Sequence, residues 1–169
     1  MSSSTRPPAW LPLLVTDAPA VRALADIAHP GLPERIEVFA ERIRLFPSGC
    51  LKLVHVGALA AYGIAHPWQL DAPPPIDALL GALPENASCL HLHDVVVAPE
   101  LRGAGASAAY IDAMVAVARA HRLSALALVS VYGTNRHWSR FGFVERSSSA
   151  LAAKLASYGA TARYLVREL

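Results

Sequence analysis

The chain has little of several features that mark other classes of protein. Its 169 residues include only two cysteines, too few for a disulfide framework, so we expect a reduced, cytoplasmic setting. No apolar run reaches the roughly 20 residues of a membrane-spanning helix, so no membrane partner is expected. The formal net charge is only +2 and no block of like charge occurs, which argues against a nucleic-acid partner.

Apolar side chains, by contrast, are abundant and make up 54% of the chain. This content and the length suit one α/β domain with a core of its own. Met1 to Pro8 is rich in serine and proline and has one basic residue, so it reads as a loose tail and not as a signal peptide. We therefore expect a flexible N-terminal tail over 1–8 and a single domain over 9–169.

Hydrophobic periodicity and turn residues predict alternating strands and helices. The longest helix carries Ile111, Met114, Val115 and Ala118 at helical spacing. The run 125–131 is almost entirely apolar, as a strand covered on both faces should be. Strands are predicted over 11–15, 50–56, 59–66, 89–97, 125–131 and 162–167, and helices over 17–28, 33–46, 77–83, 103–121, 135–140 and 150–157.

A glycine-rich turn joins the strand 89–97 to the long helix. It reads Arg102, Gly103, Ala104, Gly105, Ala106, Ser107. Such a turn leaves backbone N–H groups unpaired at the positive end of a helix, which is an arrangement that binds phosphate. The turn therefore predicts a phosphorylated cofactor.

The spacing within this turn discriminates among cofactors. A Walker loop requires Gly-Lys-Ser/Thr, and no lysine is present. The nicotinamide fingerprint GxGxxG finds two glycines, with Ala108 at the third position, which that fingerprint also admits. The better fit is Arg-x-x-Gly-x-small, formed by Arg102, Gly105 and Ser107, preceded by Val95 to Pro99. This string resembles the acyl-CoA loop of the GNAT superfamily of N-acyltransferases.

The order of predicted elements from Leu11 onward also resembles that superfamily, as does Phe141-Gly142-Phe143. The resemblance implies a single-domain α/β GNAT fold, with a mixed central sheet, a splayed central strand pair and flanking helices. It implies acetyl-CoA as co-substrate and no metal. The cofactor-binding residues that it implies are backbone groups of Val95, Val96 and Val97 for pantetheine, and Arg102, Gly103, Ala104, Gly105, Ala106 and Ser107 for the pyrophosphate.

Transfer to an amine requires a proton acceptor, because a free alkylamine with a pKa of about 10 is mostly ammonium at neutral pH. The strand offers His91 and His93, which period two places on one face. His91-Leu92-His93 at this distance from the loop resembles arylalkylamine (serotonin-type) N-acetyltransferases, where two such histidines relay the proton. The alternatives are a merely solvated strand face, and Asp94 as base or as a partner that orients a histidine. For the oxyanion that develops on the thioester, a backbone N–H of Val96 or Val97 is the expected donor.

The acid that would assist the leaving thiolate is harder to assign. Where many relatives have a tyrosine, this chain has Trp138, whose indole N–H is not an acid at useful pH. We expect Trp138 to pack against pantetheine or to donate a weak hydrogen bond. Either the thiolate leaves unassisted, or another hydroxyl serves, with Tyr158 and Tyr132 as the candidates. A half-buried tyrosine bonded to backbone is the alternative for each. Asn135 is better explained as a helix cap than as a cofactor contact.

The acceptor pocket is expected between the first two helices, their connection 29–33 and the proline-rich loop 71–75. Phe39, Phe46, Tyr62 and Trp68 are candidates for an apolar lining, with core packing as the alternative for Phe39 and Phe46. The function that follows is an acetyl-CoA-dependent N-acetyltransferase for a small-molecule primary amine. A CoA-binding regulatory domain and a peptide or protein N-acetyltransferase are the alternatives. GNAT relatives often form homodimers, and nothing in the sequence decides the oligomeric state.

Overall fold

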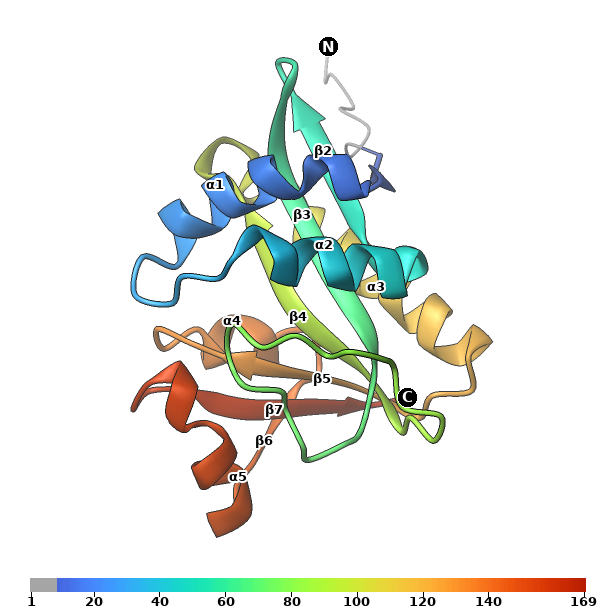
Figure 1. Cartoon of the computed structure of the whole chain (residues 1–169), viewed down its shortest axis with the longest axis vertical. Coiled ribbons are helices and arrows are strands. Elements are labelled where there is room, and N and C mark those ends of the chain that lie inside the picture. Colours follow the sequence, from blue (N-terminus) through green and yellow to red (C-terminus); the bar gives the residue numbers. More distant parts are fainter. Residues whose placement is uncertain (1–8) are drawn as a thin grey trace.

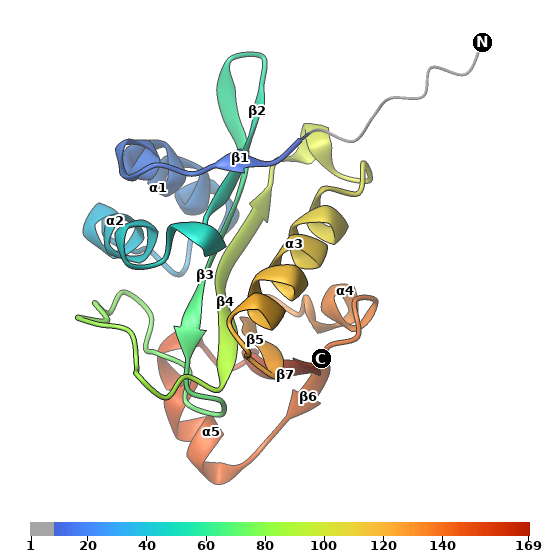
Figure 2. The same cartoon turned by 90° about the vertical axis from the view of Figure 1, so that its right-hand side faces the viewer.

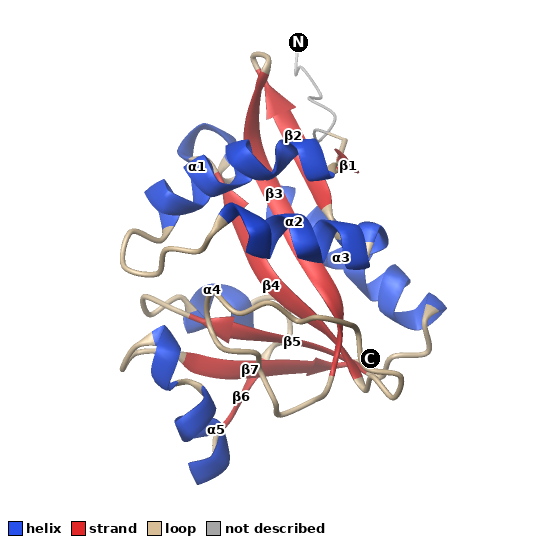
Figure 3. Cartoon of the chain, in the orientation of Figure 1, coloured by secondary structure: helices blue, strands red, loops and turns tan. Residues whose placement is uncertain are grey.

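A mixed sheet of seven strands organises the computed structural model, which describes residues 9–169 (Figures 1 and 3). The expected N-terminal tail, residues 1–8, lies outside the described residues. The strands are β1 (Leu11–Pro12), β2 (Leu51–His55), β3 (Ala58–Trp68), β4 (Cys89–Val97), β5 (Ala125–Ser130), β6 (Val144–Arg146) and β7 (Arg163–Glu168). The helices are α1 (Ala18–Ala28), α2 (Ile36–Leu45), α3 (Ala106–Ala120), α4 (Asn135–Ser139) and α5 (Ser149–Lys154).

The strands follow the spatial order β1-β2-β3-β4-β5-β7-β6. Neighbouring strands are antiparallel except β4 and β5, which run parallel. The chain leaves the end of β4, and α3 carries it back to the end of the sheet at which β4 begins, so that β5 starts there too. The mixed sheet that the sequence implied is therefore confirmed. The parallel pair lies at the centre of the order, so both of its strands are flanked by further strands.

Two helical layers cover the sheet (Figure 2). Helices α1 and α2 lie on one face over a core that includes Val21, Phe39 and Ile43, while α3 buries Ile111 and Met114 against the other face. α3 buries the stripe predicted from its spacing, because that face of the helix is apolar. α2 buries Glu41 and Arg42 beside its apolar residues, and both bond to the loop between β3 and β4.

The structure corrects several predicted boundaries. The first strand is only two residues long, and α3 begins at Ala106, because Gly103 and Gly105 both have left-handed backbone angles. No helix forms over 77–83, where Asp77 and Gly81 have positive φ and the backbone bonds to side chains of α2 and the preceding loop. The short edge strand β6 was not predicted.

Candidate active site

The central parallel pair separates part-way along its length. β4 and β5 are paired only where Leu90, His91 and Leu92 face residues 126–128. Beyond that point β4 continues to Val97, paired only with β3 on its other side. The splayed strand pair implied by the sequence is confirmed, and a gap opens between β4 and β5.

The amide directions along β4 follow from one hydrogen bond at its end. The Ala98 N–H donates to the Ala60 carbonyl at 2.8 Å, and therefore points toward β3. Successive N–H groups of an extended strand point in opposite directions. The amides of Val95 and Val97 accordingly point into the gap, whereas that of Val96 points toward β3.

The glycine-rich turn lies where this gap meets the N-terminus of α3. Gly103 and Gly105 have φ of 79° and 78°, and a Cβ added at either would meet nothing within 4 Å. Within residues 9–169, the N–H groups of Gly103 and Ala104 donate to no other backbone group. The Arg102 side chain donates to the Val97 carbonyl at 3.3 Å, which ties the turn to the end of β4. The turn thus presents free donors and open space at a helix N-terminus.

A cavity of about 640 Å³ runs from this turn along the gap to the connection between α1 and α2. It is lined by Arg102 and Ser107 at one end, and by Tyr158 and residues of the α1–α2 connection at the other. The remaining walls are Leu92 to Val97 of β4, Leu128 and Val129 of β5, the following residues Val131, Tyr132, Thr134, His137 and Trp138, and Ile76.

A β-bulge places two polar side chains of β4 on the same side of the sheet. The pairing with β3 shifts between Ile64 and Ala65, so that Ile64 faces Asp94 while Ala65 faces Leu92. His93 is the extra residue, and both His93 and Asp94 point toward α1 and α2. Simple alternation would have separated them, and the bulge brings Asp94 into the site.

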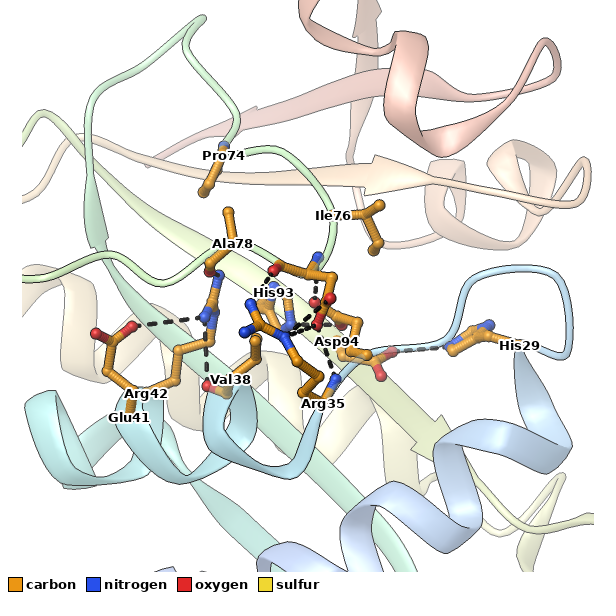
Figure 4. Close-up of polar contacts among 12 residues, drawn as sticks. His29, Arg35, Val38, Glu41, Arg42, Pro74, Ile76, Ala78, His93 and Asp94 are labelled. Carbon is orange, nitrogen blue, oxygen red and sulfur yellow. Dashed lines mark hydrogen bonds and ion pairs between the residues drawn. The ribbon is translucent and has the colours of Figure 1, made fainter.

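His93 forms a buried pair with a carboxylate from the α1–α2 connection (Figure 4). Its Nε2 lies 2.9 Å from Oε1 of Glu34, and their side chains are 1% and 5% exposed. Burial alone would raise the pKa of Glu34, but the charge and hydrogen bond of His93, the Asp77 N–H and the charge of Arg42 lower it to about 2. Glu34 is therefore ionised at neutral pH and accepts the Nε2 hydrogen of His93.

Asp94 bonds to one residue of the core and to one residue that lines the cavity. It accepts the Tyr62 hydroxyl at 2.5 Å, and its other oxygen lies 2.9 Å from His29 Nε2. Burial opposes the imidazolium form of His29, but the hydrogen bond and charge of Asp94, together with the charge of Glu34, raise the pKa of His29 above its ordinary value. The His29 ring also stacks on Tyr132 at a centroid distance of 6.0 Å.

His91 shares the face of His93, as period two predicted, but lies deeper. It is 2% exposed, does not line the cavity and sits 5.4 Å from the ring of His66, its partner across β3. Burial, reinforced by His66, His93 and Arg42, holds the pKa of His91 well below its ordinary value. His91 is therefore a neutral imidazole behind the cavity wall.

The aromatic residues considered as proton donors differ in what their polar atoms contact. The Tyr158 hydroxyl donates to the Pro74 carbonyl at 2.6 Å, and burial raises the pKa of Tyr158. The Tyr132 oxygen instead accepts the Gly31 N–H at 3.1 Å. Trp138 is half-buried on α4 and lines the cavity. Thr134, not Asn135, occupies the N-cap of α4.

The loop between β3 and β4, residues 69–88, closes the acceptor end of the cavity, and we call it the strap. Figures 1 and 3 show it between α2 and α5, and Figure 4 shows Pro74, Ile76 and Ala78 above His93. It is held from both sides by hydrogen bonds. Residues 77–81 accept from Arg35 and Arg42 and donate to Glu34 and Glu41. Residues 71–76 accept from Tyr158 and donate to the oxygens of Ser157 and Tyr164.

Core packing is confirmed for Phe39 and Phe46, and the lining expected of Tyr62 and Trp68 is wrong. Phe39, Phe46 and Tyr62 are core residues, and Trp68 packs against β5 and β7, so none of the four lines the cavity. Ile76, just after the predicted 71–75 loop, is the strap residue that does. Sequence reasoning also missed Glu34, although it had pointed to the loop just before it.

Two structural features that other functions would require are absent from the described part of the chain. No helix within residues 9–169 is long and apolar enough to cross a membrane. The same residues contain no group of three or more His, Cys, Asp or Glu side chains placed to hold a metal ion.

Comparisons with known proteins agree with this geometry. The model of the acetyltransferase (GNAT) family matches residues 20–143. No curated protein matches the chain significantly. Among solved structures, Ard1 from Thermoplasma volcanium superposes with a TM-score of 0.71 at 13% identity, covering 97% of this chain and 99% of the other. Arabidopsis thaliana Naa50 in complex with a bisubstrate analogue, CoA-Ac-MVNAL, superposes with a TM-score of 0.72 at 8% identity, covering 97% of this chain and 100% of the other. N-acetylglutamate synthase from Neisseria gonorrhoeae, in complex with coenzyme A and N-acetyl-glutamate, superposes with a TM-score of 0.69 at 19% identity, covering 95% of this chain and 35% of the other.

Proposed function

The chain belongs to the acetyltransferase (GNAT) family, and from that premise we propose that it acetylates the primary amine of a small molecule by direct attack on acetyl-CoA. The observation that carries the proposal is the single cavity that joins a phosphate-binding turn, at Gly103 and Gly105, to a histidine–carboxylate pair, His93 and Glu34. One end suits the cofactor and the other suits an amine.

The residues present fit acetyl-CoA at the turn and along the gap. Side chains are missing at Gly103 and Gly105 where backbone must approach the pyrophosphate, and the N–H groups there are uncommitted. The amides of Val95 and Val97 face the gap and suit the pantetheine arm. Arg102 and Ser107 line the same end of the cavity, and Trp138 lines it farther along. When bound, acetyl-CoA supplies the activated acyl group as a thioester.

His93 is the residue that we assign to accept the amine's proton. It lines the cavity, and ionised Glu34 fixes its Nε2 hydrogen and favours the imidazolium that forms. The sequence resemblance pairs His91 with His93 in a proton relay. The role of His91 as a second relay group, behind the cavity wall, stays a prediction. The N–H groups of Val95 and Val97 suit the negative charge that develops on the carbonyl oxygen, because both are aimed into the gap.

The strap supports a small acceptor over a polypeptide. It bonds to α2 on one side and to the segment after α5 on the other, so it lies across the end of the cavity that an extended chain would have to enter. The similarity to Naa50 favours a peptide acceptor instead. An experiment is therefore needed to decide between a small-molecule amine and a peptide as the acceptor.

The test combines binding with turnover. Calorimetry should detect acetyl-CoA binding, and thiol release should then be measured with a panel of small primary amines and a matched panel of short peptides. Activity on free amines supports the proposal, and activity on peptides alone transfers it to the peptide class. Binding of acetyl-CoA without turnover on either panel indicates a regulatory domain, and no binding at all overturns the assignment.

A further inference from the structure

One catalytic task lacks a residue in the site described so far, namely protonation of the leaving thiolate. Trp138 has no acidic hydrogen to give. The hydrogen of the Tyr158 hydroxyl is already donated to the Pro74 carbonyl at 2.6 Å, and Tyr158 is only 8% exposed. Of the three aromatic candidates this leaves Tyr132, which is 51% exposed and lines the cavity two residues after the end of β5.

Tyr132 is held in place by contacts from the opposite wall of the gap. Its oxygen accepts the Gly31 N–H at 3.1 Å, so its own hydrogen has no acceptor within residues 9–169. Its ring stacks on His29 with planes 14° apart, and His29 is in turn bonded to Asp94 of β4. The stack of Tyr132 on His29 and the bond of His29 to Asp94 therefore link the segment after β5 to β4.

The backbone around Tyr132 is strained in a way that supports a functional role. Tyr132 has φ of 54°, a left-handed conformation that costs a residue with a side chain on the order of 1–2 kcal/mol, and Gly133 follows at 72°. A Cβ added at Gly31 would lie 3.2 Å from the Tyr132 oxygen. The close approach of this loop to the phenol therefore depends on glycine at position 31.

From these contacts we propose that Tyr132 is the proton donor for the leaving thiolate, with Gly31 and His29 as its positioning residues. This inference rests on the proposed function. The neutral amine's lone pair forms the N–C bond, the C–S bond breaks with its electron pair passing to sulfur, and sulfur takes the phenolic hydrogen of Tyr132. The surplus hydrogen on nitrogen passes to His93, and water then restores the protonation of both side chains.

The first test measures binding and needs no turnover. A phenol that donates to the sulfur gives wild-type protein a preference for CoA over desulfo-CoA, about 2- to 10-fold for one hydrogen bond. Tyr132→Phe should abolish this preference and leave desulfo-CoA affinity unchanged. Tyr158→Phe, the matched control, should retain the preference. A preference that survives in Y132F, or disappears in Y158F, overturns the inference.

The second test measures turnover with the best acceptor amine. Tyr132→Phe should lower kcat by about 10- to 100-fold, with KM for acetyl-CoA little changed. Gly31→Ala, which displaces the phenol without removing it, should lower kcat by a smaller factor. A kcat in Y132F equal to that of wild type overturns the inference. Wild-type protein that binds no CoA overturns the proposed function itself, which is a distinguishable result.

Discussion

At the scale of single residues, the proposed proton acceptor is the most informative position to change. His93→Gln keeps a polar side chain but cannot carry the proton, so we expect kcat/KM to fall by about 10²- to 10⁴-fold while acetyl-CoA affinity is retained. His91→Gln and the double variant complete a cycle, and a relay requires their effects to be non-additive. If the pH–rate profile of the double variant matches that of wild type, neither histidine is the base.

The sequence predicted one half of each polar pair at the site but not the pairing: Glu34 was missed, and His29 was expected only as part of the connection 29–33. His93 and Asp94 were candidates because of their position before the glycine-rich turn. Their partners Glu34 and His29 are 59 and 65 residues away in the sequence, and no local pattern marks them. Contacts of that separation arise only when α1 and α2 pack on the sheet, so residue spacing carries no signal for them.

At the scale of elements, the glycine-rich turn allows a matched comparison. Gly105 and Gly57 have φ of 78° and 76°, and a Cβ at either meets nothing within 4 Å. Alanine at either position should therefore cost similar stability, about 1–2 kcal/mol from the left-handed backbone. Only Gly105→Ala should weaken acetyl-CoA binding, by tenfold or more, since its methyl enters the space at the helix N-terminus. Equal affinities in the two variants would show that the turn does not hold the cofactor.

The anchoring of the strap to α2 depends on a fully buried arginine. Arg42 is 0% exposed, donates to the carbonyls of Val38 and Ala78, and lies 3.8 Å from Glu41. Arg42→Met should lower the free energy of unfolding by about 3–5 kcal/mol, because it removes the donor to the Ala78 carbonyl and the cation beside Glu41. Arg44→Met, at an exposed position of the same helix, should change it by less than about 0.5 kcal/mol. Urea titrations measure both, and a small loss in R42M would remove Arg42 as the anchor.

Elements with strong periodicity were predictable, and those decided by tertiary contacts were not. α1 ends at Ala28 as predicted because Pro30 follows the end of its apolar stripe. The helix expected over 77–83 is absent because its backbone groups bond to Glu34, Arg42 and Glu41 in place of one another. The bulge at His93 has no signature in the sequence either, since it is a property of the pairing with β3.

At the scale of the whole molecule, the cofactor half of the site was more predictable than the acceptor half. The turn at 102–107 and the strand before it are contiguous in sequence, so one motif describes both. The acceptor end combines the α1–α2 connection, the bulge, the strap and Tyr158, which only the complete fold brings together. A motif can therefore indicate acyl-CoA chemistry while leaving the acceptor amine open.

The buried histidines should make the whole domain sensitive to mild acid. Burial lowers the pKa of His66 to about 3 and holds that of His91 well below its ordinary value. Both depressed values mean that their stabilising effect is present above pH 6.5, the unfolded value, and is lost as the pH falls toward the folded value. Glu34, with its pKa lowered from 4.5 to about 2, adds a loss only below pH 4.5. The raised pKa of His29 contributes stability that is present below pH 6.5 and is lost as the pH rises above that value.

Between pH 6 and 4.5 the free energy of unfolding should therefore fall by about 1.4 kcal/mol per pH unit for each buried histidine. His66→Asn keeps a donor for the Pro67 carbonyl, 3.1 Å from His66 Nδ1, but cannot titrate. Its stability should accordingly fall about half as steeply as that of wild type, whereas His55→Asn, on the exposed end of β2, should leave the slope unchanged. Urea titrations across this range measure the slopes. Parallel lines for H66N and wild type would mean that His66 is already protonated in the folded protein, and that the interior around it is more polar than its burial indicates.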